Sequence, residues 1–365
     1  MLLPFAFAIA TFIGMGVLLL PLLFQQTGLI LGTGVLCLAA LLMALLAFIV
    51  LDLIKLAKKD LPSSIEAFLT KGLQPLVRIS LAVFTYGALV AYVIGAGEQL
   101  SALLGGGAQY WGTLFFVLAA LLVIRKGKLS ASVSMYLTLA LLVVLAILIP
   151  ANLLVASYPV PALTGWTSVP FLLSISIFAL FGHFAMYELY HLLPRDRDRY
   201  SAFFGAFFLS FLLYVAYALS AASVGPMGPL STVSLLFYHG PVLRVVMSLV
   251  AVLAFYTSFV SVSNSFIHPI TQVAKSENHA GAALALLFFP AAFLYVLVHT
   301  YQLMTLTELV ARFCGVGILL FAVLACLAHF RAARKFPAQT RTPGWLSIAL
   351  AFIFSAITAF NIFPL

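Results

Sequence analysis

Charged residues are scarce in this chain. Only 7% of its 365 residues are Asp, Glu, Lys or Arg, whereas 64% are hydrophobic. Apolar runs of about 20 residues, the length that spans the hydrocarbon core of a bilayer, recur along the sequence. A soluble fold could not bury so much apolar surface, so the sequence predicts an all-α polytopic membrane protein in a lipid bilayer. The net charge of +9 does not indicate nucleic-acid binding, because no segment is long enough to form a separate basic domain.

Cysteine and catalytic motifs are scarce as well. Cys37, Cys314 and Cys326 fall inside apolar segments, without metal-ligand spacing or a disulfide partner in a loop. We therefore expect no bound cofactor. The motifs His-Glu-x-x-His and Gly-x-Ser-x-Gly and a pair of catalytic Asp residues are all absent, so we do not expect an enzyme. The first apolar stretch has no basic leader and no obvious cleavage site, which predicts a retained helix and not a signal peptide.

The apolar segments predict eleven transmembrane helices. They lie at 3–24, 28–51, 78–103, 109–124, 132–156, 168–193, 201–224, 242–266, 282–299, 306–329 and 345–362. Of the 18 Lys and Arg residues, all but Arg244 and Arg312 fall on one side with this count. The positive-inside rule then places the N-terminus in the cytoplasm and the C-terminus outside. Short loops and the absence of an Asn-x-Ser/Thr sequon favour a prokaryotic cytoplasmic membrane.

Two of these segments carry residues that interrupt a helix near mid-membrane. The first, Leu3 to Phe24, contains Gly14-Met15-Gly16 and Pro21, and the sixth contains Phe181-Gly182-His183. Broken helices leave backbone N–H and C=O groups that can bind a charged solute. The two segments are five helices apart and run in opposite directions, which predicts an inverted repeat: residues 1–156, residues 157–330 and an additional helix in 331–365. Close helix packing is the alternative explanation for any single glycine.

Four stretches, taken in order, carry a resemblance to a known family. They are Ile9-Ala10-Thr11-Phe12-Ile13-Gly14-Met15-Gly16-Val17-Leu18 with Leu20-Pro21 and Gln26-Thr27-Gly28, Ala91-Tyr92-Val93-Ile94-Gly95-Ala96-Gly97-Glu98, Phe181-Gly182-His183 with Leu193-Pro194, and Thr257-Ser258-Phe259-Val260-Ser261-Val262. These stretches resemble helices one, three, six and eight of the amino acid/auxin permease family, within the amino acid–polyamine–organocation superfamily. The last stretch is similar to the bacterial aromatic and hydroxy amino acid permeases.

The resemblance implies a LeuT-type fold that holds an amino acid between helices one, three, six and eight. The half-helix starting near Met15 would direct its N–H groups at the substrate carboxylate. The ammonium would be received by carbonyls near Phe12, Phe178, Ala179 and Phe181. The implied substrate-binding residues are Phe12, Gly14, Met15, Gly16, Val17, Tyr92, Phe178, Ala179, Phe181, Gly182, His183 and Phe184. Phe181 stands where many eukaryotic members have Glu, so their substrate and coupling rules do not carry over. The apolar surroundings favour a neutral hydrophobic or aromatic substrate.

The coupling ion is Na⁺ or H⁺ on this evidence. Thr257 and Ser258, with Ser261 one turn on, match the place where Na⁺-coupled members of this fold supply hydroxyl ligands. Such hydroxyls also commonly bond to the preceding helical turn and do nothing more. The fifth segment lacks the lysine that replaces the ion in some relatives, which favours Na⁺. His183 could carry a proton instead, or simply bond to a nearby carbonyl.

Glu98, Glu308 and Arg312 are gate candidates. Glu98 lies near the outer end of the third segment, where it could gate entry or simply reach the headgroup region. Glu308 and Arg312 are spaced to pair on the tenth, where a structural role is favoured over an outer gate. The leading hypothesis for the whole chain is an ion-coupled symporter that takes up amino acids by alternating access. The alternative is a non-transporting amino acid sensor or scaffold with the same fold. A channel is disfavoured because the helices offer no polar stripe.

Overall fold

The computed structural model describes residues 2–124, 128–163, 165–228, 230–236, 238–273, 281 and 284–362. Within these ranges the chain is helical and contains no strand. The first half comprises α1 (Leu2–Phe12), α2 (Met15–Thr27), α3 (Leu29–Ala57), α4 (Leu61–Glu66), α5 (Gln74–Leu104), α6 (Ala108–Ile124) and α7 (Lys128–Leu154). The second comprises η1 (Trp166–Ser168), α8 (Val169–Ala179), α9 (Ala185–Leu192), α10 (Asp196–Ala222), α11 (Ser231–Leu235), α12 (Pro241–Val273), η2 (Leu284–Phe288), α14 (Phe289–Thr300), α15 (Leu306–Glu308), η3 (Leu309–Cys314), α16 (Gly315–Lys335) and α17 (Gly344–Ile362).

Seven helical stretches in the described ranges are long and apolar enough to cross a membrane. They are Leu29–Ala57, Gln74–Leu104, Tyr136–Leu154, Asp196–Ala222, Pro241–Ile267, Leu306–Lys335 and Gly344–Ile362. Four shorter apolar stretches accompany them: Met15–Thr27, Ala108–Ile124, Trp166–Ala179 and Leu284–Thr300. The expectation of a polytopic helical membrane protein is therefore met. Eleven separate crossings remain a prediction, and Arg125, Lys126 and Lys275, three basic residues used to orient the chain, lie outside the described residues.

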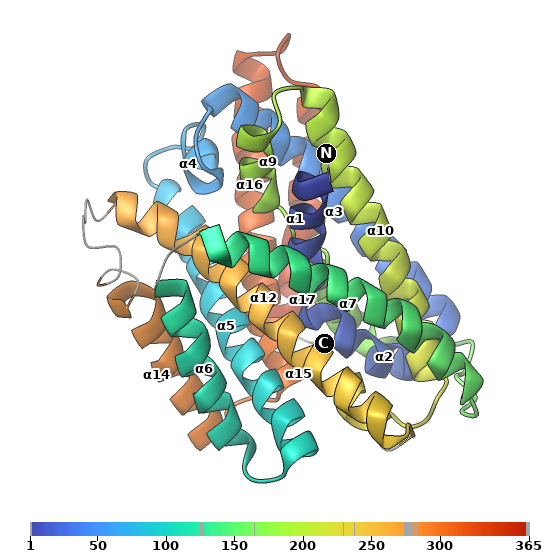
Figure 1. Ribbon diagram of the computed structural model, residues 1–365. Coiled ribbons are helices and arrows are strands. Elements are labelled where there is room, and N and C mark those ends of the chain that lie inside the picture. The colour runs from blue at the N-terminus through green and yellow to red at the C-terminus, as the bar shows by residue number, and fades with distance from the viewer. Residues whose placement is uncertain are drawn as a thin grey trace.

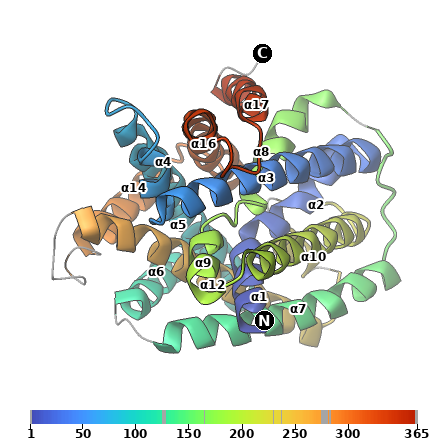
Figure 2. The same cartoon turned by 90° about the horizontal axis from the view of Figure 1, so that it is seen from above.

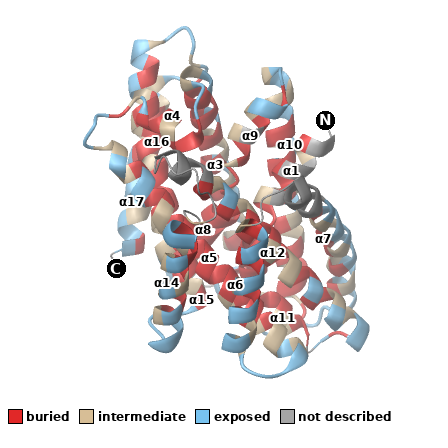
Figure 3. Cartoon of the chain, turned by 60° about the vertical axis from the view of Figure 1, so that its left-hand side comes forward, coloured by how far each residue is buried: buried red, intermediate tan, exposed pale blue. Residues whose placement is uncertain are grey.

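The helices form a bundle around α1, α2 and α8. Helix α10 packs along both α1 and α2, whereas α3 packs against α8. Helices α16 and α17 lie side by side at one edge of the bundle (Figure 2), and α4 and α9 lie near the same end of the molecule (Figure 1). Buried residues concentrate in the middle of the bundle and exposed ones on the outward faces of helices such as α7 and α14 (Figure 3). The core thus surrounds the interrupted helices.

Two short helices, α4 and α11, lie in connections that the sequence analysis had treated as loops. Neither is long enough to produce a hydrophobic period. Helix α4 nevertheless has local signals, because Asp60 accepts a hydrogen bond from the Ser63 N–H at 2.8 Å and Pro62 occupies the first turn. These signals could have identified it, since capping residues followed by proline mark a helix start.

Candidate functional site

The first helix break separates α1 from α2. Helix α1 ends at Phe12, and α2 begins at Met15 after Gly14, whose backbone is extended with φ −138° and ψ −155°. No side chain caps the start of α2. The first N–H groups of a helix have no partner inside it, and they carry the positive end of the helix dipole. The break predicted at Gly14 to Gly16 is therefore present, and it leaves N–H donors available for an anionic group.

The second break separates α8 from α9. Helix α8 ends at Ala179 and α9 begins at Ala185, with Phe181, Gly182 and His183 between them. The segment folds into tight turns, in which the Phe181 N–H donates to the Phe178 carbonyl at 3.2 Å. The C-terminal end of α8 carries carbonyl oxygens and the negative end of its dipole. The predicted interruption is present here too, with the opposite polarity to the start of α2.

Glycines let the two breaks touch. A Cβ atom on Gly16 would overlap both the Cα and the Cβ of Ala179, and one on Gly182 would overlap the ring of Phe12. Only a residue without a side chain fits at these positions, because the obstacle at Gly16 includes backbone. The start of α2 thus lies directly against the end of α8, in the middle of the membrane-length bundle.

A small cavity lies at this junction. Its volume is about 30 Å³, and it is lined by Thr11, Phe12, Gly14, Met15, Gly16, Phe84, Tyr92, Phe178, Ala179, Phe181, Phe184, Ser258, Ser261 and Val262. None of these side chains is charged. This space holds only a few water molecules, so the site must widen before it can hold a larger solute.

Aromatic rings form one wall of the cavity. Phe84 stacks on Phe184 with ring centroids 5.6 Å apart, and it meets Phe181 edge to face at 5.2 Å. Phe181 and Phe184 also pack edge to face, at 5.3 Å. Because offset and edge-to-face rings attract one another, these three phenylalanines form a cohesive apolar surface. The sequence analysis named Phe181 and Phe184 and missed Phe84, which only its contacts distinguish from the other phenylalanines.

The polar side of the cavity is supplied by α5 and α12. Tyr92 is buried, and its side chain lines the cavity together with Ser258. The Ser258 Oγ lies only 2.5 Å from where a Gly14 Cβ would be, so this hydroxyl faces the α1–α2 break directly. Ser261 lines the same cavity. The predicted pairing of helix-eight hydroxyls with the first break is therefore brought about by Ser258.

Tyr214 of α10 joins the two breaks and was not anticipated. Its buried hydroxyl donates to the carbonyl of Phe12 and lies 3.1 Å from the carbonyl oxygen of Ala179. These are the last residues of α1 and α8. The sequence offered no signal for this role, because the chain has 14 tyrosines and the partners of Tyr214 are distant in sequence.

Some predicted site residues lie away from the cavity. Val17 is buried in the first turn of α2 without lining it. His183 is fully buried, and its Nε2 donates to the Met43 carbonyl of α3 at 3.1 Å. The Thr257 hydroxyl donates to the Ala254 carbonyl of its own helix at 3.0 Å. Gly182 serves packing against Phe12. Direct substrate contact by these four residues would require a rearrangement.

The gate candidates lie elsewhere. Glu308 closes a capping box with Thr305 at the start of α15, and its Oε1 lies 3.9 Å from the Arg312 guanidinium. The predicted pair is confirmed. Arg312 also lies over the ring of Phe171, 5.4 Å from its centroid. Glu98 is half-buried near the end of α5. None of the three lines the cavity at the breaks.

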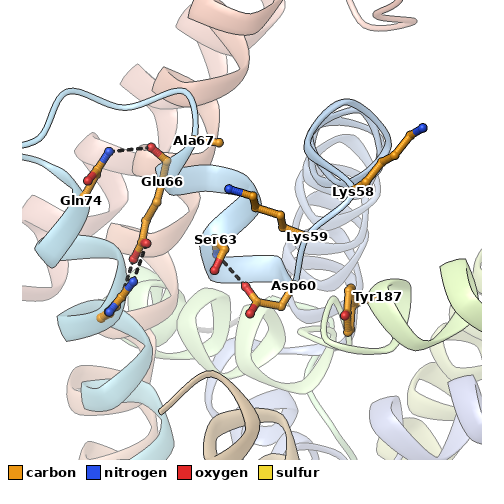
Figure 4. Close-up of a pocket in the computed structure, with 9 residues that line it drawn as sticks. Lys58, Lys59, Asp60, Ser63, Glu66, Ala67, Gln74 and Tyr187 are labelled. Carbon is orange, nitrogen blue, oxygen red and sulfur yellow. Dashed lines mark hydrogen bonds and ion pairs between the residues drawn. The ribbon is translucent and has the colours of Figure 1, made fainter. Parts of the chain in front are cut away.

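A larger hollow of about 610 Å³ lies between α4, the start of α5 and Tyr187 of α9 (Figure 4). Its polar side chains mostly engage one another. Glu66 forms a paired contact with Arg78 at 2.6 and 2.7 Å, and Asp60 caps α4. Lys58 and Lys59 are exposed at its rim. The hollow is open and of mixed charge, so it offers no defined site for one solute.

Two interrupted helices that meet in the middle of a membrane-length bundle are a feature of transporter folds. Comparison with solved structures supports the same class of fold. The chain matches crystal structures of two single-residue mutants of the Eremococcus coleocola manganese transporter, each with TM-score 0.67 and 13% identity over 99% of this chain and 86% of that one. The same transporter in complex with an aromatic bis-isothiourea substituted compound matches with TM-score 0.62 and 14% identity. The chain is therefore an integral membrane protein with a transporter fold.

Sequence comparison adds no assignment, since no family model and no curated protein matches the chain. Metal-ligand chemistry can be checked directly. Across the described residues, no three His, Cys, Asp or Glu side chains come together as a metal site requires. The likeness to the manganese transporter structures shows the fold alone.

Proposed function

We propose that this chain is an ion-coupled secondary transporter of amino acids with a LeuT-type fold, related to the amino acid/auxin permeases. The observation that carries the proposal is the cavity at the two breaks. It brings together the N–H end of α2 and the carbonyl ends of α1 and α8. A zwitterion has a carboxylate and an ammonium a short distance apart, which complements this pair of helix ends.

The side-chain lining supports a neutral, apolar substrate. Phe84, Phe181 and Phe184 form a ring wall, and Tyr92 adds an aromatic face with a hydroxyl. An acidic or basic side chain would be left without an opposite charge in this cavity, which costs several kcal/mol at low dielectric. Hydrophobic and aromatic amino acids avoid that cost, so phenylalanine, tryptophan and leucine are the proposed class.

Manganese is disfavoured as the substrate. A divalent cation needs several oxygen, nitrogen or sulfur ligands to replace its water, and the cavity lining offers the thioether of Met15 and the hydroxyls of Thr11, Tyr92, Ser258 and Ser261. Carboxylate, imidazole and thiolate groups are missing from that lining. The amino acid proposal and the fold likeness are compatible, since one fold can carry different sites.

Sodium is the proposed coupling ion, with Ser258 as the principal side-chain ligand. Its hydroxyl faces the α1–α2 break, where backbone carbonyls also end. Thr257 is a weaker candidate because its hydroxyl already donates to Ala254. Proton coupling through His183 is the rival. That histidine is buried beside Met43, and its Nδ1 has no hydrogen-bond partner.

Transport would proceed by alternating access. Residues 1–156 and 157–330 are the proposed inverted repeats, and the additional helix lies in 331–365. In this proposal the chain crosses a prokaryotic cytoplasmic membrane eleven times, and its N-terminus lies in the cytoplasm. The small cavity volume supports a mechanism in which the bundle opens around a fixed midplane site.

Equilibrium binding to the purified protein tests the substrate class. L-phenylalanine, L-tryptophan and L-leucine should bind at least about tenfold more tightly than L-glutamate or L-lysine, a difference of about 1.4 kcal/mol. Mn²⁺ is the control ligand suggested by the fold. Tight Mn²⁺ binding with no response to any amino acid would overturn the proposal. Amino acid binding without uptake into liposomes would favour the non-transporting sensor.

A further inference from the structure

The Tyr214 hydroxyl lies against the last carbonyls of two helices. Its two neighbours, the Phe12 and Ala179 carbonyls, end α1 and α8 respectively. The side chain is fully buried, and it comes from α10, outside the two broken helices. One hydroxyl therefore contacts both breaks.

The two carbonyls are better suited to an ammonium than to a hydroxyl. A tyrosine O–H has one proton, so it can donate fully to only one carbonyl at a time. An ammonium has three protons and a positive charge, and it would satisfy both oxygens with stronger, charge-assisted bonds. The same oxygens also lie at the negative ends of two helix dipoles.

The two donors compete for one position beside the Phe12 and Ala179 carbonyls. The cavity beside the breaks measures about 30 Å³, and Gly16 is packed against Ala179. An ammonium placed between the Phe12 and Ala179 carbonyls would take the position of the Tyr214 hydroxyl. The hydroxyl must move away for such a group to enter.

We propose that Tyr214 is a specificity-determining latch, whose hydroxyl holds the carbonyl ends of α1 and α8 until a substrate ammonium displaces it. The proposal rests on the proposed amino acid function and deepens it. A ligand with a carboxylate and a ring but no ammonium could not replace the hydroxyl on both carbonyls. The latch thus selects amines over simple carboxylic acids and couples their binding to opening of the closed cavity.

The test compares Tyr214→Phe with Tyr217→Phe. Tyr217 lies one turn further along α10, is equally buried, and bonds to Ser231 at 2.9 Å. Tyr214→Phe removes the competing hydroxyl, so this variant should bind L-phenylalanine roughly fivefold more tightly than the native protein. That factor corresponds to the net free energy of about one hydrogen bond. Affinity for 3-phenylpropanoate, which lacks the ammonium, should change less than about twofold. Tyr217→Phe should alter neither affinity.

Two results would overturn the latch. Weaker L-phenylalanine binding by Tyr214→Phe than by Tyr217→Phe would make the hydroxyl a substrate ligand. An equal change for both ligands would make it a structural staple only. The native protein gives a test that needs no variant, because 3-phenylpropanoate should compete with labelled L-phenylalanine at least about tenfold less well than unlabelled L-phenylalanine. Equal competition would contradict the proposal.

Amide hydrogen exchange separates this proposal from the proposed function. Tyr214→Phe should speed exchange at residues 13–16 and 180–184 about fivefold relative to Tyr217→Phe, because the breaks lose their common donor. If the native protein binds no amino acid, the proposed function fails while this comparison still decides the latch. Unchanged exchange at both breaks would overturn it.

Discussion

The helix breaks and the charged end of the bundle differ in the partners of their polar groups. At the breaks, backbone ends face a cavity whose side chains are all uncharged. At the end that holds α4 and α9, charged side chains neutralise one another. Asp196 lies 3.2 Å from Lys55, 2.8 Å from Arg199 and 4.0 Å from Arg341. The Asp196 carboxylate is thus paired within the chain, whereas the first N–H groups of α2 have no side-chain cap.

Asp52 is a buried carboxylate that also bonds to groups on other elements. One carboxylate oxygen accepts the Arg341 and Thr342 N–H groups at 2.9 and 3.0 Å, and it lies 3.2 Å from the Nε2 of His329. His329 in turn contacts the Ser347 hydroxyl at 2.7 Å. Asp52 therefore ties α3 to α16 and to the connection before α17. The contrast teaches that polar side chains tie the scaffold together, whereas backbone groups at the two helix breaks line the cavity.

The largest effect should come from filling the contact between the breaks. Gly16→Ala places a methyl group on the Ala179 backbone, which must push α2 away from α8. Overpacking of this kind costs about 1–3 kcal/mol, so L-phenylalanine binding should fall by about tenfold or more. Gly34→Ala is the control, because its Cβ would meet nothing within 4 Å. Equal affinities for the two variants would contradict the placement of the site.

Removing the buried carboxylate should break the scaffold and spare the site. Asp52→Ala removes the acceptor of three hydrogen bonds, which come from His329, Arg341 and Thr342. We expect a loss of about 3 kcal/mol in the free energy of unfolding. Denaturation of the detergent-solubilised protein measures the loss, with Asp198→Ala at the same end as the control. The folded fraction should keep its L-phenylalanine affinity within about twofold. A large change in affinity with unchanged stability would reverse the roles assigned to the two regions.

The hydroxyls of α12 should differ in their effect on ion coupling. Ser258→Ala removes the group that faces Gly14, so it should raise the Na⁺ concentration for half-maximal uptake about fivefold. Thr257→Ala removes a hydroxyl that bonds within its own helix, and the expected change is below about twofold. Uptake titrated with Na⁺ compares the variants. The opposite order would place the ion at Thr257.

The smallest effect should come from an exposed ion pair. Lys55→Ala removes a side chain that is 43% exposed. Asp196 still forms its ion pair with Arg199, at 2.8 Å. Exposed pairs contribute less than about 1 kcal/mol, so both stability and affinity should stay near native values. Thermal denaturation at low and high salt measures the contribution. A loss comparable to that of Asp52→Ala would show that the charged end is a cooperative network.

The sequence predicted the long apolar helices and the position of both breaks, because length, hydropathy and the glycines at 14, 16 and 182 are local signals. It also predicted the Glu308–Arg312 pair, which follows from helical spacing. It could not predict Tyr214, whose hydrogen bonds join residues 202 and 35 positions away. The direction of the His183 side chain was equally hidden, because the path of the non-helical segment that turns it to Met43 depends on packing.

Uptake of labelled L-phenylalanine into proteoliposomes, under an imposed Na⁺ gradient and separately under an H⁺ gradient, tests the central claim most directly. The account predicts concentrative uptake driven by Na⁺, reduced in Ser258→Ala and nearly lost in Gly16→Ala. Uptake driven only by H⁺ would retain the transporter and move coupling toward His183. No uptake of any amino acid under either gradient would contradict the claim that the paired helix ends form an amino acid transport site.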